Sequence, residues 1–231
     1  MTSFPRAAIA PAALALTSVF IAGVAHAEAG DWIVRGGVTY VAPNDNTSSR
    51  NGELAPALQG TDVAVSSEPQ FGLTIAYLLS DNLAVELLGA SPFKHDLTLS
   101  GGALDGSPLG DIKHLPPTVL LQYYPMNPDS AVQPYVGAGI NYTTFFEEDL
   151  TSARKAQGFS DLELDDSWGL ALEAGVDYML TDKLLVNASV WYMDIETDAT
   201  VKGPTALSIS KTKVNVDVAP WVYMVGLGYK F

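Results

Sequence analysis

Apolar and polar residues alternate along eight segments of the chain. In the last of these, every second residue from Trp221 to Phe231 is aromatic or aliphatic, whereas Gly226, Gly228 and Lys230 lie between them. A period of two is typical of β-strands whose two faces meet different surroundings. The other segments with this alternation cover residues 32–40, 70–79, 83–93, 116–124, 133–144, 168–179 and 184–193.

The connections between these segments alternate in length. Short turns are expected at residues 80–82, 125–131 and 181–183, and long polar segments at residues 42–69, 100–111, 150–166 and 202–213. Both chain ends then lie on the short-turn side, which requires an even number of strands. This plan is typical of outer-membrane barrels with short periplasmic turns and long extracellular loops. We therefore predict an all-β fold, an eight-stranded antiparallel transmembrane β-barrel.

One face of the predicted strands suits lipid. Aromatic residues stand at the ends of these faces, as with Trp32 and Tyr40 or Trp168 and Tyr178, which matches the aromatic girdles of membrane proteins. A closed barrel also leaves no unpaired backbone group in hydrocarbon. A soluble lipocalin-like barrel would instead place its apolar face inward and a charged face outward. The second face here carries glycines and few charges, so the membrane barrel is favoured.

The first 27 residues have the form of a secretory signal peptide. Arg6 supplies a positive charge, residues 7–24 form an uncharged apolar stretch, and Ala25-His26-Ala27 resembles a cleavage site. We predict that residues 1–27 are removed and that residues 28–231 form the barrel. The expected location is the bacterial outer membrane.

Charge and chain end indicate the partners. The formal net charge of −14 argues against nucleic acid, because phosphate binding needs clustered Lys and Arg. Tyr229 and Phe231 resemble the C-terminal signal by which outer-membrane barrels are recognised for insertion. The expected partners are outer-membrane lipid, lipopolysaccharide and the barrel insertion machinery. Since one chain closes the barrel, a monomer is expected.

Charged residues on the second face point into the predicted lumen. An eight-stranded barrel is narrow enough for side chains to fill its interior, and charges at this depth need partners. Two interpretations stay open: a salt-bridge network that closes the periplasmic half, and a selectivity filter in a continuous pore. The predicted polar plug consists of Arg35, Glu86, Glu173, Asp177 and Lys230.

The extracellular half of the predicted lumen is apolar, which suggests a cavity for an apolar guest rather than a water-filled pore. The alternative is that the alternation slips at Pro92 or Pro220, since prolines in strands mark bulges and edges. A further alternative is that these side chains stand above the lipid and pack on one another. The residues concerned are Trp191, Met193, Ile195, Val214, Val216 and Val218.

Three stretches, "SPFKHDLTLSG", "KHLPPTVLLQYYPM" and "PWVYMVGLGYKF", carry a family resemblance. In this order, on an eight-strand plan, they make the chain similar to the OmpW family of outer-membrane proteins. The resemblance implies a narrow hydrophobic channel that is open to the outside and blocked toward the periplasm. It also implies a lateral route through the wall, and hence passive uptake of small hydrophobic molecules that lipopolysaccharide otherwise excludes.

The resemblance places the wall opening at Pro92, Pro116 and Pro117. The residues themselves agree, because proline cannot donate a ladder hydrogen bond and so weakens pairing beside it. Two other functions stay open: a narrow through-channel for small neutral solutes such as amino acids, and a surface-recognition barrel without transport. The through-channel would need the plug charges to leave a water-filled gap. The surface-recognition barrel would bind its partners with the extracellular loops.

Catalytic and metal-binding patterns are not found in the sequence. There is no cysteine, no G-x-S-x-G and no H-E-x-x-H motif, so neither an enzyme, a cofactor nor a metal site is expected. His95 and His114 would come close if their strands pair. A metal site or proton switch there competes with a simpler hydrogen-bonding role at the rim.

Overall fold

The computed structural model describes residues 29–42, 62–65, 69–100, 106–203 and 212–231. Within these ranges, no helix combines the length and the hydropathy needed to cross a bilayer. The predicted signal peptide, residues 1–27, lies outside the described residues. Its boundary therefore stays a prediction.

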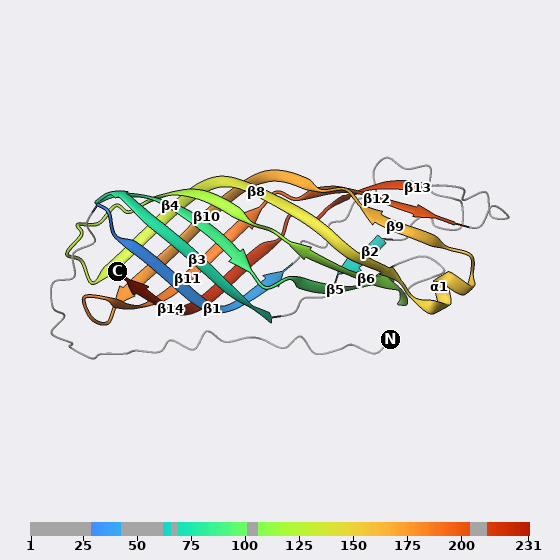
Figure 1. Cartoon of the computed structure of the whole chain (residues 1–231), viewed down its shortest axis with the longest axis horizontal. Helices are drawn as coiled ribbons and strands as arrows, with labels where there is room; N and C mark the ends of the chain where they lie inside the picture. Colours follow the sequence, from blue (N-terminus) through green and yellow to red (C-terminus); the bar gives the residue numbers. More distant parts are fainter. Residues whose placement is uncertain (1–28, 43–61, 66–68, 101–105, 204–211) are drawn as a thin grey trace, which may run out of the picture.

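Eight strands form a closed antiparallel barrel, which confirms the predicted fold (Figure 1). In chain order they are β1 (Trp32–Ala42), β3 (Pro69–Ser80), β4 (Leu83–Ala90), β7 (Thr118–Tyr123), β8 (Val132–Leu150), β10 (Ser167–Met179), β11 (Leu184–Met193) and β14 (Trp221–Lys230). β14 pairs with β1 from Ile33↔Lys230 to Ala42↔Trp221, and this ladder closes the ring. Short turns join β3 to β4, β7 to β8 and β10 to β11 at the end where the chain terminates.

The outer surface of the barrel is an apolar band. Along β14, Val222 and Met224 are buried, whereas Tyr223, Val225 and Leu227 between and beyond them are exposed. Because successive side chains of a strand point to opposite faces, this pattern sets one face outward and one into the lumen. Outward apolar positions with high exposure recur around the ring, which suits a hydrocarbon surrounding.

Aromatic side chains pair at both ends of this band. Near the short turns, the ring centroids of Trp32 and Tyr77 lie 4.8 Å apart. At the other end, those of Tyr142 and Trp168 lie 4.6 Å apart. These two levels are where the interfaces of a bilayer would lie.

The wall continues beyond the upper aromatic level, where the sequence predicted mostly loops. On one side, β5 (Phe93–Ser100) and β6 (Ser107–Leu115) pair with each other, β6 pairs with the upper part of β8, and β2 (Asp62–Val65) pairs with β5. On the other side, β9 (Ser160–Leu164), β12 (Glu196–Lys202) and β13 (Thr212–Asp217) form a three-stranded sheet. A short helix, α1 (Ser152–Ala156), joins β8 to β9. Figure 1 shows these elements extending the barrel to the right.

The interior is layered along the barrel axis. An apolar cluster near the short turns includes Ile33, Leu78 and Leu185. A second apolar cluster higher up includes Leu120, Trp191 and Met224. Polar side chains, described below, separate the two. A third cluster, of Leu97, Ile112, Leu150 and Leu162, lies among the added strands.

Candidate functional site

Arg35 on β1 is the centre of the polar layer. Its side chain is fully buried, and its guanidinium reaches two other walls of the barrel. Nε donates to Asp177 Oδ1 at 2.9 Å and Nη2 to Asp177 Oδ2 at 2.6 Å, while Nη1 donates to Glu86 Oε2 at 2.9 Å. Nη2 also donates to the Tyr124 hydroxyl at 2.7 Å. This two-pronged pairing has the geometry of strong charge-assisted hydrogen bonds.

Neutral polar side chains extend this network across the lumen. The Tyr124 hydroxyl donates to Gln122 Oε1 at 3.0 Å, and Gln122 Nε2 donates to Glu173 Oε2 at 2.9 Å. Asn187 Nδ2 donates to Asp177 Oδ1 at 2.8 Å and to the Tyr135 hydroxyl at 2.9 Å. These four neutral residues were not among the sequence-predicted plug residues, because that prediction considered charges alone. Their inward position in the alternation was the available signal.

The structure therefore brings four of the five predicted plug residues into one layer. Arg35, Glu86 and Asp177 are directly paired, and Glu173 joins them through Gln122. Lys230 lies apart, with its Nζ 3.6 Å from Asp31 Oδ2 near the chain end. The geometry of the layer is that of an ion-pair network in a filled lumen, and a continuous pore would have to displace it.

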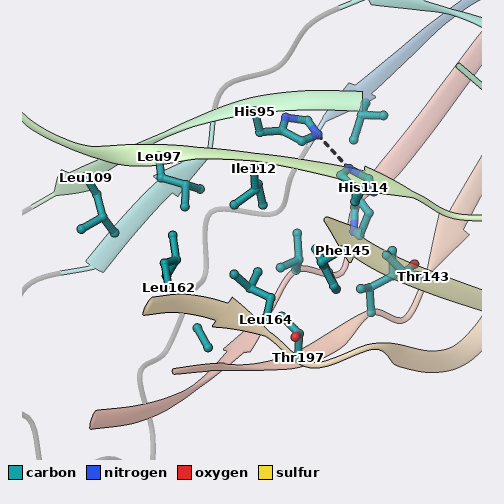
Figure 2. A pocket seen from close by; sticks show the side chains of 15 residues that line it. His95, Leu97, Leu109, Ile112, His114, Thr143, Phe145, Leu162, Leu164 and Thr197 are labelled. Atoms are coloured by element: carbon teal, nitrogen blue, oxygen red, sulfur yellow. Dashed lines mark hydrogen bonds between the residues drawn. The ribbon is translucent and has the colours of Figure 1, made fainter. Parts of the chain in front are cut away.

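An apolar cavity of about 90 Å³ lies above the barrel, between the added strands (Figure 2). Its volume is large enough to hold more than a single water molecule, and its apolar lining suits a small apolar molecule. We refer to it as the chamber. Its lining comprises Val41, His95, Leu97, Leu109, Ile112, His114, Thr143, Phe145, Leu162, Leu164, Ile195, Thr197, Ala199, Val218 and Pro220.

The predicted apolar lumen residues fall at different levels. Ile195 and Val218 line the chamber, and Met193 lines a smaller cavity below it. Trp191 is completely buried in the packed cluster. The side chains of Val214 and Val216 lie outside the described residues.

Sequence reasoning missed most of the chamber wall. Leu97, Leu109, Ile112, Leu162 and Leu164 lie on β5, β6 and β9. Leu109, Leu162 and Leu164 fall in the long polar segments predicted at residues 100–111 and 150–166. The alternation of Phe93, His95 and Leu97 was the signal that could have extended the predicted segment beyond residue 93.

Strand pairing is interrupted at the three predicted prolines, and we refer to this interruption as the gap. The ladder between β4 and β7 ends at Leu88↔Thr118, and pairing resumes between β5 and β6 at Phe93↔His114. Residues 89–92 and 115–117 have no partners in the ladders between these strands. Pro92, Pro116 and Pro117 all lie within these two stretches.

Backbone pairing is kept on both outer sides of the gap. Ser91 N donates to Phe71 O at 3.0 Å, which ties the first stretch to β3. Tyr142 N donates to Pro117 O at 3.0 Å, which ties the second stretch to β8. The opening is therefore confined to one seam of the wall.

The chamber extends toward this gap. A second cavity, of about 20 Å³, is lined by Gly89, Ala90 and Pro116 at the gap. It shares four lining residues with the chamber: Val41, His114, Ile195 and Pro220. A Cβ placed on Gly89 would meet no heavy atom within 4 Å, so a larger side chain has room at this position.

His95 and His114 face each other in the chamber wall. Their Nε2 atoms lie 2.9 Å apart, and their ring centroids lie 4.9 Å apart at an interplanar angle of 15°. Burial, followed by the charge that His95 can carry, lowers the pKa of His114 to about 3. Within the described ranges, no group of three or more metal-ligating side chains is found. The sequence expected the two residues to meet only if their strands pair, and they do.

Comparisons with known proteins agree with this architecture. The model of the OmpW family matches residues 28–231. The chain belongs to the OmpW family. The crystal structure of OprG from Pseudomonas aeruginosa is similar to this OmpW-family chain with a TM-score of 0.83 and 55% identity, covering 90% of this chain and 99% of OprG. Outer membrane protein W of Vibrio cholerae is 47% identical over 95% of each chain.

The resemblance inferred from the sequence motifs is thus confirmed, and this OmpW-family chain is an outer-membrane β-barrel. Its homologues are outer-membrane barrel proteins, a non-enzymatic kind. A more distant relative from Pseudomonas aeruginosa, 27% identical over 91% of this chain and 93% of its own length, is named dibenzothiophene metabolism operon protein PahQ. The family is consistent with transport or uptake of small molecules.

Proposed function

We propose that this OmpW-family barrel takes up small hydrophobic molecules through the chamber and releases them sideways into the outer membrane. The observation that carries the proposal is that the chamber and the cavity at the gap adjoin each other, because four residues line both. The path is passive, because nothing in it needs coupling to an energy source. The three prolines mark the exit.

The relative costs of the two exits favour the lateral one. An apolar guest gains about 0.8 kcal/mol per buried CH₂ in the chamber, and a similar amount in lipid, so transfer between them is nearly neutral. Passage toward the periplasm requires parting Arg35 from Asp177 and Glu86. Leaving one charge of a buried ion pair without its partner typically costs about 3–5 kcal/mol, which sets the scale of this barrier. The polar plug therefore turns an apolar guest toward the gap.

Two further considerations support an apolar guest. The chamber lining is almost entirely hydrocarbon, with few polar side chains. The relative PahQ bears a name that refers to dibenzothiophene, which is itself a small apolar aromatic molecule. A through-channel for small neutral solutes would instead need a wet gap through the layer around Arg35, where the described side chains are buried.

The expected partners follow from the same arrangement. Lipopolysaccharide and outer-membrane lipid would contact the apolar band, and lipid would accept the guest at the gap. Phe231 is 65% exposed and its ring centroid lies 4.8 Å from that of Tyr229. This outward aromatic pair suits recognition by the barrel insertion machinery, and a ring closed by one chain suits a monomer.

Uptake of a small apolar fluorophore by liposomes with an outer lipopolysaccharide leaflet tests the proposal. Gly89→Phe places a bulky side chain in the open space beside the gap without a backbone clash. Ala174→Phe, at an exposed position on β10, adds the same bulk to intact wall and serves as control. We expect wild type and the control to accelerate uptake and Gly89→Phe to fall toward the protein-free rate. Equal uptake by all three proteins, at matched insertion, would overturn the lateral route.

A further inference from the structure

The chamber carries few polar atoms, and most are already engaged within the protein. Its polar lining side chains are Thr143, Thr197 and the two histidines (Figure 2). Thr143 Oγ1 donates to Asn141 Oδ1 at 2.7 Å, and Thr197 Oγ1 donates to the backbone oxygen of Asp165 at 2.6 Å. Both hydroxyl hydrogens are therefore used, and the histidine pair is left to be considered.

His114 has a ring nitrogen with no partner. Its Nε2 shares one hydrogen bond with His95 Nε2, whereas its Nδ1 is buried and makes no hydrogen bond to the residues that the structure describes. The residue is 9% exposed and lines both the chamber and the smaller cavity at the gap. Figure 2 shows the ring of His114 beside His95 in the chamber wall. Its Nδ1 has almost no accessible surface, so a guest reaches this atom only when neighbouring side chains shift. Buried polar groups are normally satisfied, so an unpartnered one calls for an explanation.

The pair can present either hydrogen-bonding character at this nitrogen. When His114 donates from Nε2, its Nδ1 is a lone pair and accepts. When His95 donates instead, His114 accepts at Nε2 and carries its hydrogen on Nδ1, which then donates. One neutral imidazole thus offers a single site that suits a hydroxyl or a carbonyl group.

The ring that carries this site is held in place. The ring centroids of Phe93 and His114 lie 5.4 Å apart at an interplanar angle of 23°. The ring centroids of His114 and Phe145 lie 5.9 Å apart. Aromatic packing of this kind restricts the ring orientation. The nitrogen therefore keeps a fixed direction at the junction between chamber and gap.

Building on the proposed function, we propose that the preferred guests are apolar molecules with one neutral hydrogen-bonding group, an alcohol or a carbonyl compound. The guest's polar group binds His114 Nδ1 while its hydrocarbon part occupies the chamber. Ionised guests are disfavoured, because an unpaired charge is costly in an apolar cavity. The low pKa of His114 agrees, since a neutral imidazole offers no counter-charge to a carboxylate.

Binding of benzyl alcohol, toluene and benzoate to the protein in lipid nanodiscs tests this inference. Each amount bound is divided by the same compound's partition into protein-free nanodiscs, which removes the contribution of lipid. One neutral hydrogen bond corresponds to about a five-fold preference. We expect this ratio for benzyl alcohol to exceed that for toluene by this factor in wild type, and benzoate to show no chamber binding.

His114→Phe keeps an aromatic ring and removes both nitrogens. We expect it to bind toluene as wild type does and to lose the preference for benzyl alcohol. Nitrogen chemical shifts of His114 in wild type provide a second reading, because benzyl alcohol should shift Nδ1 and toluene should not. Equal ratios in wild type, or a preference that survives in His114→Phe, would overturn the inference and leave the proposed function standing. If neither neutral guest binds, both fail.

Discussion

Replacing Arg35 tests whether the polar layer is a packed plug or a solvated constriction. Its guanidinium is fully buried and pairs with Asp177 at 2.6 Å and Glu86 at 2.9 Å. Arg35→Met removes the cation and keeps much of the side-chain volume. Both carboxylates then lose their charged partner in a dry lumen.

The expected loss of stability is large. Removing one partner of a buried ion pair typically costs about 3–5 kcal/mol, because a charge is left buried without compensation. Arg35 has two such partners, although Asp177 keeps the amide of Asn187 at 2.8 Å. We therefore expect the free energy of unfolding to fall by roughly 4 kcal/mol. In the triple variant with Glu86→Gln and Asp177→Asn added, most of this loss should be recovered, because the two carboxylates that Arg35 pairs with are replaced by neutral amides.

Reversible urea unfolding in lipid vesicles, followed by tryptophan fluorescence, measures these differences. Lys94→Met is the control, because the Lys94–Asp111 pair is 52% and 38% exposed and lies 3.3 Å apart. Exposed pairs contribute about 0–1 kcal/mol. A loss below about 1 kcal/mol for Arg35→Met would mean that its partners are solvated. That result would refute the filled lumen and favour a water-containing pore.

Two further predictions concern the chamber and its exit. The pKa of His114 is lowered to about 3 from an unfolded value of about 6.5, so protons bind the unfolded segment first and stability is lost as the pH falls below 6.5. At pH 5 the free energy of unfolding of the added strands should be lower by about 2 kcal/mol. Faster hydrogen exchange in β5 and β6 would report this loss, and His114→Phe should not show it. Exchange that does not change with pH would contradict a buried neutral ring. Pro92→Ala restores a backbone donor beside the gap and should slow uptake of the apolar fluorophore, whereas unchanged uptake would count against Pro92 as part of the exit.

The barrel was predictable because lipid and lumen impose opposite demands on neighbouring residues. In the segment from Trp221 to Phe231, these opposite demands produce an alternation with a period of two that is visible in the sequence. The strands beyond the prolines were harder. Pro92 and Pro116 interrupt the ladder, and the alternation was followed only to residue 93 and again from residue 116, whereas β5 and β6 resume pairing at Phe93↔His114.

The sequence predicted which residues point into the lumen better than it predicted which of them contact one another. The inward charges Arg35, Glu86 and Asp177 follow from strand alternation, but which of them meet depends on the stagger of strands around the ring. The pairing of Glu173 with Gln122 is a consequence of that stagger. The chamber depends on how two separate sheets face each other, and no local pattern encodes that distance. His95 and His114 needed only the pairing of β5 with β6 to meet.

A reversible closure of the gap tests lateral exit most directly. The chain has no cysteine, so Gly89→Cys with Leu115→Cys offers a single pair for a reducible bifunctional linker across the seam. Leu87→Cys with Val119→Cys, directly paired in the intact ladder between β4 and β7, is the matched control. Lateral exit predicts that cross-linking stops uptake of the apolar fluorophore, that reduction restores it, and that the control pair has no effect. Uptake that continues through the cross-linked gap would contradict the account.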